Sequence, residues 1–391
     1  MSIKELDQQY VAGTYRRFPV EIVSGQGSVL TDVNGKQYID LGSGIGVTAF
    51  GIADPTWQAA VTAQLGRVQH TSNLYYTEPC ARLAEMLCTR TGMKKVFFSN
   101  SGAEANECAI KAARKYAAAR RGDDCATIVT FKNSFHGRTL TTLAATGQDT
   151  FHKLYQPLTP GFCHIEAGAD LCELEALCAR QKVAAVLFEC VQGEGGVVPV
   201  DGGFLREMAA FCKERDILVM VDEVQTGNGR TGALYAYMNF GLTPDVVSTA
   251  KGLGGGLPLG ATLLGEKVAD VFGPGDHGST FGGNPVCCAG AISVLERLDD
   301  AFLASVRTKS ERLVARLTAS KGIESVTGLG LMLGLKTVRP AAEVVSECIA
   351  RGVLCLTAKD KVRLLPALNI PDDLLMQAAD TILSVCEEGL Q

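Results

Sequence analysis

The sequence predicts an α/β protein with a mostly parallel central sheet covered by helices, and a smaller α+β domain built from the two ends of the chain. Apolar runs of strand length alternate with longer helical patterns through the middle, which is typical of parallel sheets. The two ends show different patterns, described below. A chain of 391 residues also exceeds the size that one compact core usually fills.

The central elements follow one another in regular order. Buried-type strands alternate with amphipathic helices, each preceded or followed by a glycine, proline or polar turn. We predict strands over 94–100, 126–131, 183–190, 217–224 and 245–250, and helices over 103–121 and 203–215.

The ends of the chain are predicted to form the smaller domain. The stretch SVLTDVNGKQYIDL resembles a hairpin turned at Asn34-Gly35, a pair that favours tight hairpin turns. After about residue 290, long amphipathic helices are interleaved with short apolar runs such as GVLCLTA and KVRLLPAL. We therefore expect an N-terminal segment of the small domain at 1–45, a large domain at 46–290 and the C-terminal part of the small domain at 291–391.

Composition excludes several classes of function. A net charge of -5 leaves no basic excess for nucleic acid or an anionic membrane surface. The charged start MSIKELDQQY lacks the apolar core of a secretory signal, and no apolar run reaches membrane-span length, so we expect a cytoplasmic protein. The 14 cysteines include no C-x-x-C pair and indicate buried small side chains rather than a disulfide scaffold or a metal site.

The stretch ILVMVDEVQTGNGRTG places Asp222 and Glu223 at the end of a buried strand, where an open α/β sheet forms its binding crevice. Its tail, GNGRTG, matches the G-x-G-x-x-G dinucleotide pattern. However, the first glycine does not follow the strand directly, and Gly241 and Pro244 interrupt any following helix. A nicotinamide enzyme and a glycine-rich loop without a ligand remain as alternatives.

Lys251 comes directly after the apolar run DVVSTA and is followed by GLGGGLPLG. A lone lysine is usually a solvated surface residue. Here the buried strand before it, and Asp222 at the end of the preceding strand, indicate an amine held in a sheltered crevice.

Two further motifs add to the carboxylate of Asp222 and the amine of Lys251. In SNSGAEANE, Ser101 and Glu104 form an S-x-x-E capping box at the start of a long helix, whose free N–H groups can bind phosphate. FKNSFHGRT offers the ring of Phe135, the imidazole of His136 and the guanidinium of Arg138. A phosphate cradle, a stacking face, a carboxylate and a lysine together are what pyridoxal 5'-phosphate (PLP) requires.

These motifs resemble those of the class III aminotransferases of fold-type I PLP enzymes, and among them the acetylornithine aminotransferases. The similarity runs nearly end to end. It includes YIDLGSGIGVTAFG, HTSN, SNSGAEANE, FHGRT, ECVQGEGG, DEVQTGNGRTG, HGSTFGGNP and VRLLPAL.

The resemblance implies a role for each site residue. Lys251 would carry PLP as a Schiff base and act as the catalytic base, with Asp222 as its catalytic partner at the pyridine nitrogen. The cofactor-binding set it implies is Gly102, Ala103, Phe135, Asp222, Glu223, Val224, Gln225, Lys251 and, from the neighbouring subunit, Thr280. The substrate-binding set is Arg138, Glu194, Ser279 and Arg363, with Glu194 neutralising Arg363 while the amino donor is bound.

The resemblance also implies the reaction and its partners. The terminal amino group of N2-acetylornithine would pass to 2-oxoglutarate in a ping-pong reaction, in a homodimer with shared active sites. Other ω-aminotransferases, acting on succinylornithine, ornithine or 4-aminobutyrate, an aminomutase and a non-catalytic binding protein remain alternatives.

The sequence departs from the family pattern at GIADP and at Ala103, and Ile45 distinguishes it from the ornithine aminotransferases. GIADP at 51–55 stands where relatives usually show G-H-x-H-P, and we expect a loop leading into a helix there. Ala103 stands where relatives often carry threonine, and Ile45 lies in a stretch where ornithine aminotransferases carry an aromatic residue.

Overall fold

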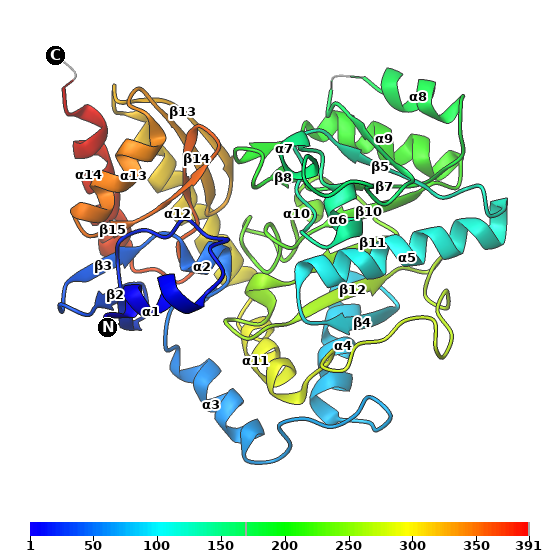
Figure 1. Ribbon diagram of the computed structural model, residues 1–391, viewed down its shortest axis with the longest axis horizontal. Coiled ribbons are helices and arrows are strands. Elements are labelled where there is room, and N and C mark those ends of the chain that lie inside the picture. Colours follow the sequence, from blue (N-terminus) through cyan, green and yellow to red (C-terminus); the bar gives the residue numbers. More distant parts are fainter. Residues whose placement is uncertain (169, 390–391) are drawn as a thin grey trace.

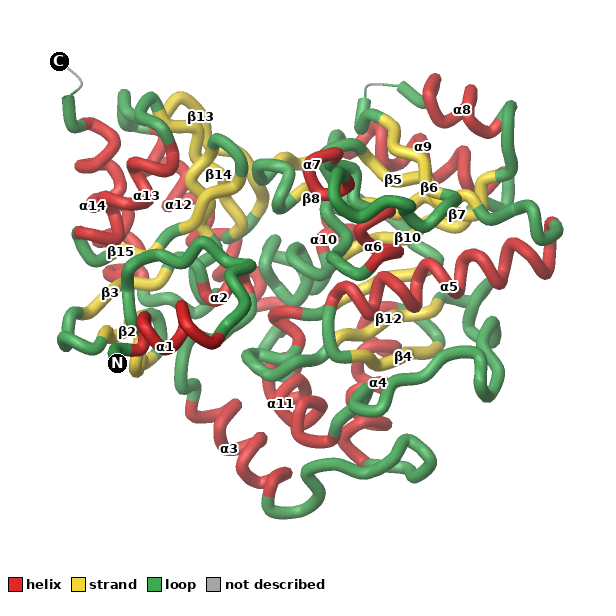
Figure 2. The backbone as a smooth tube through the Cα atoms, in the orientation of Figure 1, coloured by secondary structure: helices red, strands yellow, loops and turns green. Residues whose placement is uncertain are grey.

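A seven-stranded sheet covered by helices forms the larger part of the molecule in the computed structural model, which describes residues 1–168 and 170–389 (Figures 1 and 2). The strand order is β4-β12-β11-β10-β7-β5-β6. β12 is antiparallel to both of its neighbours, and the other four pairings are parallel. The strands are β4 (Lys95–Ser99), β5 (Thr127–Phe131), β6 (Phe162–Ile165), β7 (Val183–Phe188), β10 (Leu218–Asp222), β11 (Val246–Thr249) and β12 (Gly260–Leu264).

The centre of this sheet explains the continuous apolar runs in the sequence. Every residue of β7, β10 and β11 is buried, because helices cover the sheet and leave these strands no solvated side. β10 and β11 run parallel with Asp222 opposite Ser248. Their carboxyl ends therefore lie side by side, and this places Asp222 next to the turn that carries Lys251.

The helices follow their predicted patterns. α5 contacts five strands of the sheet, α9 packs on β10, and α11 packs against α3 and α4. The helices of the described chain are α1 (Ile3–Tyr10), α2 (Ser43–Gly46), α3 (Pro55–Leu65), α4 (Glu78–Thr91), α5 (Gly102–Arg121), α6 (Leu140–Ala145), α7 (Asp149–His152), α8 (Cys172–Cys178), α9 (Gly202–Glu214), α10 (Ala236–Asn239), α11 (Pro285–Leu295), α12 (Asp300–Thr318), α13 (Ala341–Ala350), α14 (Asp372–Glu387) and the 3-10 turn η1 (Lys251–Leu253). α3 starts at the proline of GIADP, as expected.

The two ends of the chain share one sheet, on the same side of the molecule (Figure 1). The predicted hairpin is present, since β2 pairs with β3 in antiparallel register and Gly35 takes a positive φ of 80° in the turn. β15 then adds to β3 in parallel. The strands of the terminal parts are β1 (Ile22–Gln26), β2 (Val29–Asp32), β3 (Gln37–Asp40), β13 (Ile323–Leu329), β14 (Met332–Thr337), β15 (Val353–Leu354), β16 (Leu356–Ala358) and β17 (Lys361–Leu364), and a short pair is formed by β8 (Val191–Gln192) and β9 (Val198–Pro199).

The domain limits at 45/46 and 290/291 remain predictions. The second of them falls inside α11, a continuous helix that packs on α3 and α4. Residue 169 of the predicted large domain and residues 390 and 391 of the predicted small domain lie outside the described residues.

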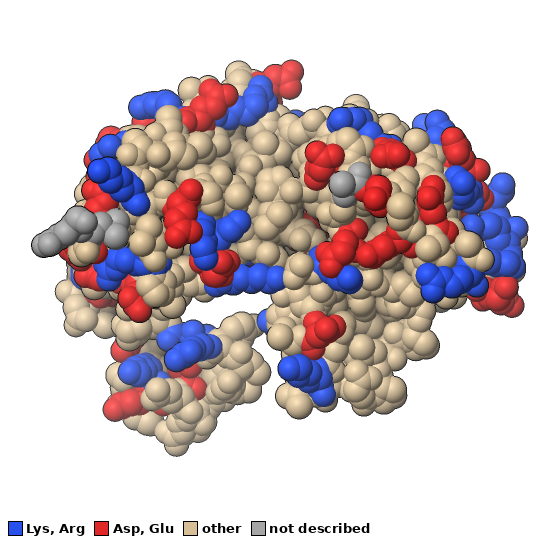
Figure 3. Space-filling view, turned by 90° about the horizontal axis from the view of Figure 1, so that it is seen from above, with Lys and Arg blue, Asp and Glu red and all other residues tan. Residues whose placement is uncertain are grey.

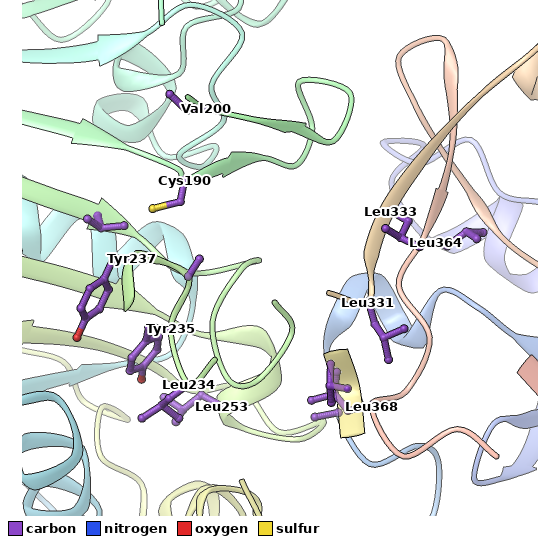
Figure 4. Close-up of a cluster of buried hydrophobic side chains, with 14 of the residues drawn as sticks. Cys190, Val200, Leu234, Tyr235, Tyr237, Leu253, Leu331, Leu333, Leu364 and Leu368 are labelled. Carbon is purple, nitrogen blue, oxygen red and sulfur yellow. The ribbon is translucent and has the colours of Figure 1, made fainter. Parts of the chain in front are cut away.

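Apolar packing joins the central sheet to the C-terminal part. Figure 4 shows side chains of the central region, among them Leu234 and Leu253, together with Leu331, Leu333, Leu364 and Leu368 of the C-terminal part. All of the labelled residues belong to one contiguous buried cluster. Arg230 also crosses this boundary, because its Nη1 donates to the carbonyls of Leu331 (3.0 Å) and Pro366 (2.5 Å). The GNGRTG segment thus forms turns whose arginine faces the protein interior, and it does not open the helix that dinucleotide binding needs.

The surface carries charges of both signs. On the face seen in Figure 3, Lys and Arg side chains are interspersed with Asp and Glu side chains. Among the described residues, no helix combines the length and the apolar character needed to cross a membrane.

Candidate active site

A cavity of about 500 Å³ lies where the carboxyl ends of β10 and β11 meet the start of α5. Motifs from four separate parts of the sequence converge on it. The predicted site residues that line it are Gly102, Ala103, Phe135, Arg138, Asp222, Val224, Gln225 and Lys251.

Lys251 sits on a strained backbone at the end of β11. Its φ of 45° lies in the left-handed region, which is costly for a residue with a side chain and is found mostly at functional sites. Burial lowers the pKa of the Lys251 ammonium, and the carboxylates of Glu194 and Asp222 offset part of this effect. A lowered pKa gives the neutral amine that nucleophilic attack requires.

The Asp222 carboxylate is held by three donors. His136 Nδ1 and Asn106 Nδ2 each lie 2.8 Å from its Oδ2, and the backbone N–H of Val224 donates to its Oδ1 at 3.0 Å. Asn106 is fixed in turn by the hydroxyl of Ser248, which donates to its Oδ1 at 2.6 Å. The carboxylate is therefore buried, fixed in orientation and supplied with hydrogen-bond partners at both oxygens.

The start of α5 differs in one detail from the predicted capping box. Ser101 Oγ accepts the N–H of Glu104 at 3.2 Å, as predicted, but the Glu104 carboxylate accepts the N–H of Asn100 at 2.6 Å instead of the N–H of Ser101. The reciprocal bond thus shifts by one residue, because Asn100 also offers its side-chain amide to the same oxygen at 2.8 Å.

The backbone at Gly102 lies against Val224. A Cβ built on Gly102 would lie 2.5 Å from Val224 Cγ1, so only glycine lets the helix start approach this side chain. The N–H groups of Gly102 and Ala103 belong to the first turn, where no carbonyl of the same helix can accept from them. Together with the positive end of the helix dipole, they form an anion-binding cradle.

A buried carboxylate, that of Glu189, binds the backbone of Phe135. Glu189 Oε1 accepts the N–H of Phe135, and its Oε2 accepts the N–H of Gly193, both at 2.9 Å. Burial raises the pKa of Glu189 to about 7, with His136 lowering it and Asp222 raising it further.

The two predicted substrate arginines have different surroundings. Arg363 on β17 is 3% exposed, and its Nη1 lies 2.5 Å from Glu194 Oε1 and 3.3 Å from Gln225 Oε1. Burial raises the pKa of Glu194, but the charge and the hydrogen bond of Arg363 outweigh this and hold it below its usual value. This pair does not line the cavity itself and reaches it through Gln225, which does.

Arg138 is exposed on the cavity wall. Its guanidinium carbon lies 4.7 Å from the ring centroid of Phe151 and 5.6 Å from that of Phe135. Within the described residues it takes part in no ion pair, so its N–H groups are available to a ligand.

Comparison with known proteins agrees with this geometry. The family model described as aminotransferase class-III matches residues 10–386.

The chain belongs to the class III aminotransferases.

Individual relatives extend the comparison. The acetylornithine aminotransferase of Haemophilus ducreyi is 50% identical over 388 residues, covering 99% of this chain and 98% of the relative. The succinylornithine transaminase of Salmonella agona is 43% identical over 394 residues, covering 98% and 96%. A solved ornithine aminotransferase from Toxoplasma gondii, described with PLP at its active site, matches with a TM-score of 0.93 and 30% identity, covering 98% of this chain and 93% of that one.

This class III aminotransferase is a PLP-dependent transaminase of fold-type I, and its substrates are an amino donor and a keto-acid acceptor. The residues of the cavity fit PLP. The cradle at Gly102 suits its phosphate, Val224 and Phe135 offer faces to its ring, and Lys251 offers an amine to its aldehyde.

Three predicted residues lie elsewhere in the transaminase. Ser279 and Thr280 line a second cavity of about 640 Å³ together with His70 and Asn73, although Ser279 Oγ accepts from Asn100 Nδ2 at 3.1 Å. Glu223 is fully buried and faces away from the first cavity.

The carboxylate of Glu223 is occupied by the protein itself. It accepts the N–H of Tyr237 at 2.8 Å and the hydroxyl of Thr226 at 2.6 Å, and burial raises its pKa to about 7. Its side chain therefore gives no support to the predicted cofactor contact and indicates a structural role.

Several residues of this site were not predicted from the sequence. Asn106 and Glu189 were not singled out, and His136 was noted without a role. Each lies inside one of the motifs of the sequence, and for Glu189 the available signal was a charged residue within the apolar run VAAVLFEC.

Proposed function

We propose that this protein transfers the terminal amino group of N2-acetylornithine to 2-oxoglutarate, giving N-acetylglutamate 5-semialdehyde and glutamate, a reaction of arginine biosynthesis. It would do so in the cytoplasm as a homodimer. The observation that carries the proposal is the contrast between its two arginines, one free at the cavity and one paired with Glu194 behind it.

The two substrates differ in the charges they bring. N2-acetylornithine reacts at its terminal amine, so its single carboxylate lies far from the reacting carbon, where Arg138 can bind it. 2-Oxoglutarate has a carboxylate at each end and needs both guanidinium groups, which bind carboxylates with two parallel hydrogen bonds. Arg363 can serve the second carboxylate when Glu194 releases it, and Glu194 keeps this buried cation paired when the donor is bound.

In this proposal PLP would be held covalently by Lys251 and noncovalently by the α5 start, Val224, Phe135, Gln225 and Asp222. When bound, PLP stores the amino group between the two half-reactions and delocalises the electron pair left by the broken C–H bond. Asp222, oriented by His136 and Asn106, keeps a proton on the ring nitrogen because its negative charge stabilises the protonated form. Lys251 Nζ, once released by the incoming amine, accepts the proton from the substrate's reacting carbon.

The homodimer part of the proposal rests on Ser279 and Thr280. Their separate cavity is lined by the exposed side chain of Leu74, and the exposed ring of Phe281 lies 5.3 Å from that of the lining residue His70. A second copy of the chain could cover both apolar side chains. Thr280 would then reach the partner's phosphate site. Light scattering of the purified holoenzyme tests this, since a fully active monomer would contradict it.

A second candidate donor is N2-succinylornithine, because a relative named as a succinylornithine transaminase is 43% identical over 394 residues. In both donors acylation removes the charge of the α-amine. Ile45, which is 39% exposed two residues before the cavity residue Val47, carries no aromatic ring that could select free ornithine.

A donor panel decides between these candidates. The values of kcat/KM are measured for N2-acetylornithine, N2-succinylornithine, ornithine and 4-aminobutyrate with 2-oxoglutarate as acceptor. We expect N2-acetylornithine to be preferred at least about tenfold over free ornithine. A preference for ornithine or 4-aminobutyrate would overturn the proposed substrate while leaving the transaminase chemistry in place.

A further inference from the structure

Arg138 differs from Lys251, the other cation that lines the cavity, because its contacts with the described residues are to aromatic rings. Its guanidinium lies over Phe151 at 4.7 Å and over Phe135 at 5.6 Å. The two rings meet edge to face, with centroids 5.8 Å apart and an interplanar angle of 66°. A guanidinium that lies on a ring face makes this contact through its own face. Its five N–H groups point outward from its edge and remain able to donate hydrogen bonds to a carboxylate.

Phe151 is well fixed for such a role. It lies in the short helix α7, whose His152 places Nε2 2.8 Å from the carbonyl of Thr146 and 3.0 Å from that of Leu143. At the start of the helix, Gln148 Nε2 donates to the carbonyl of Ser134 at 3.0 Å. α7 is thus tied both to α6 and to the loop that carries Phe135 and Arg138.

The rings of Phe135 and Phe151 differ in their position relative to the cavity. Phe135 lines the cavity and is assigned above to the ring of PLP, whereas Phe151 does not line it. The face of Phe151 is therefore free to serve Arg138 alone. No carboxylate of the described chain pairs with Arg138. Removing the ring of Phe151 would therefore leave the guanidinium with the more distant ring of Phe135, at 5.6 Å, and with more rotamers open to it.

We propose that Phe151 is a positioning residue that holds Arg138 in the orientation that binds the substrate carboxylate. This inference rests on the proposed function, because it takes Arg138 as the carboxylate-binding arginine. Phe151 touches neither the cofactor nor the reacting atoms and acts through Arg138, on both the amino donor and 2-oxoglutarate.

The variants Phe151→Leu and Phe151→Tyr test the inference in the holoenzyme. Leucine keeps an apolar side chain without a ring face, and tyrosine restores the face. For Phe151→Leu we expect KM to rise roughly 3- to 10-fold for both substrates, with kcat within about twofold, and the dissociation constant of glutarate to rise by a similar factor in calorimetry. Phe151→Tyr should return these values toward those of the parent.

A matched control is available in the same chain. Arg114 lies over the ring of Phe162 at 5.2 Å, away from the cavity, so Phe162→Leu removes an equivalent cation–ring contact. We expect it to leave KM and glutarate binding unchanged. Unchanged glutarate binding in Phe151→Leu, or an effect on kcat alone, would overturn the inference.

Arg138→Lys separates this inference from the proposed function. If Arg138→Lys weakens glutarate binding and Phe151→Leu does not, only the role of Phe151 fails. If neither change affects glutarate binding or KM, the assignment of the carboxylate to Arg138 fails, and the inference fails with it.

Discussion

The two arginines have contrasting surroundings, and the proposed function gives them two different tasks. Arg363 lies on a strand, 3% exposed, and is paired with Glu194 at 2.5 Å. Arg138 is an exposed residue of the loop between β5 and α6, and its guanidinium lies over two aromatic rings. Burying a cation without a counter-charge costs several kcal/mol, so the interior site needs a carboxylate partner, whereas the exposed site does not. In the proposed function, movement of Glu194 would therefore release the interior arginine for a carboxylate, whereas the exposed arginine would be available in both half-reactions.

We expect the largest effect from replacing Lys251, because its amine is needed in both half-reactions. Lys251→Ala should lower turnover by at least about 10³-fold, because it removes the amine that holds the cofactor and moves the proton. The absorbance of the bound cofactor should shift as well, even if PLP still binds noncovalently. Steady-state rates and absorbance spectra measure this, with the exposed Lys213→Ala as control. Normal turnover in Lys251→Ala would contradict the assumption that both half-reactions depend on this amine.

Exchanging the arginines for alanine tests the comparison directly. Arg138→Ala should slow both half-reactions, on the order of 10²-fold, because both substrates need a far carboxylate site. Arg363→Ala should slow the 2-oxoglutarate half-reaction by a similar factor and the N2-acetylornithine half-reaction far less. Single-turnover spectra of each half-reaction measure these losses. Equal losses in the two half-reactions of Arg363→Ala would contradict the assignment of Arg363 to 2-oxoglutarate.

Replacing Glu194 tests whether its ion pair with Arg363 influences the choice of amino donor. In Glu194→Gln, Arg363 keeps a hydrogen-bond acceptor but loses its ion pair. It should then favour substrates with a carboxylate next to the reacting carbon, such as glutamate, over N2-acetylornithine, which has none there. We expect the preference for N2-acetylornithine over glutamate as amino donor to fall roughly tenfold, measured by kcat/KM. An unchanged preference would mean that the pair is structural.

The smallest effect concerns a carboxylate without a cation. Burial raises the pKa of Glu223 to about 7, above its ordinary value of 4.5, so the folded protein binds a proton that the unfolded chain releases. Its contribution to the free energy of unfolding is therefore complete below about pH 4.5 and is lost as the pH rises through about 7. In Glu223→Gln this loss should disappear, a relative change of roughly 2–3 kcal/mol between pH 5 and pH 8.

Urea unfolding midpoints at a series of pH values measure the Glu223 effect. Glu189 has a similarly raised pKa and remains in both proteins, so the difference between parent and variant isolates Glu223. Parallel pH profiles would mean that Glu223 is charged in the folded state.

Local patterns were sufficient to predict much of the fold and part of the site. Strand length, helical periodicity and the Asn34-Gly35 turn depend on neighbouring residues, and the structure has each of these elements. The cavity residues were found because four motifs each carry their own chemistry. By contrast, the support of Asp222 by Asn106 and the ring of Phe151 under Arg138 depend on packing between separate elements.

The details that escaped prediction are tertiary. The bond between Arg363 and Glu194 joins residues 169 positions apart and was expected only from the resemblance. The reciprocal bond of Glu104 moved to Asn100 because a second donor was present there, which no capping pattern encodes. Glu223 has the same local context as Asp222, and only the opposite directions of their side chains in the folded sheet separate their roles.

The position of β4 has a consequence for synthesis of the chain. In the seven-stranded sheet β4 has β12 as its neighbour, and these strands begin at Lys95 and Gly260. A ribosome that adds about 5–20 residues per second therefore needs roughly 10 to 30 s to deliver the partner strand after β4 has emerged. During that time the backbone of β4, with Phe97 and Phe98, is an unpaired edge that other nascent chains can join. We expect yields of native protein to depend on elongation rate and on chaperones that cover this segment until residue 264 has emerged.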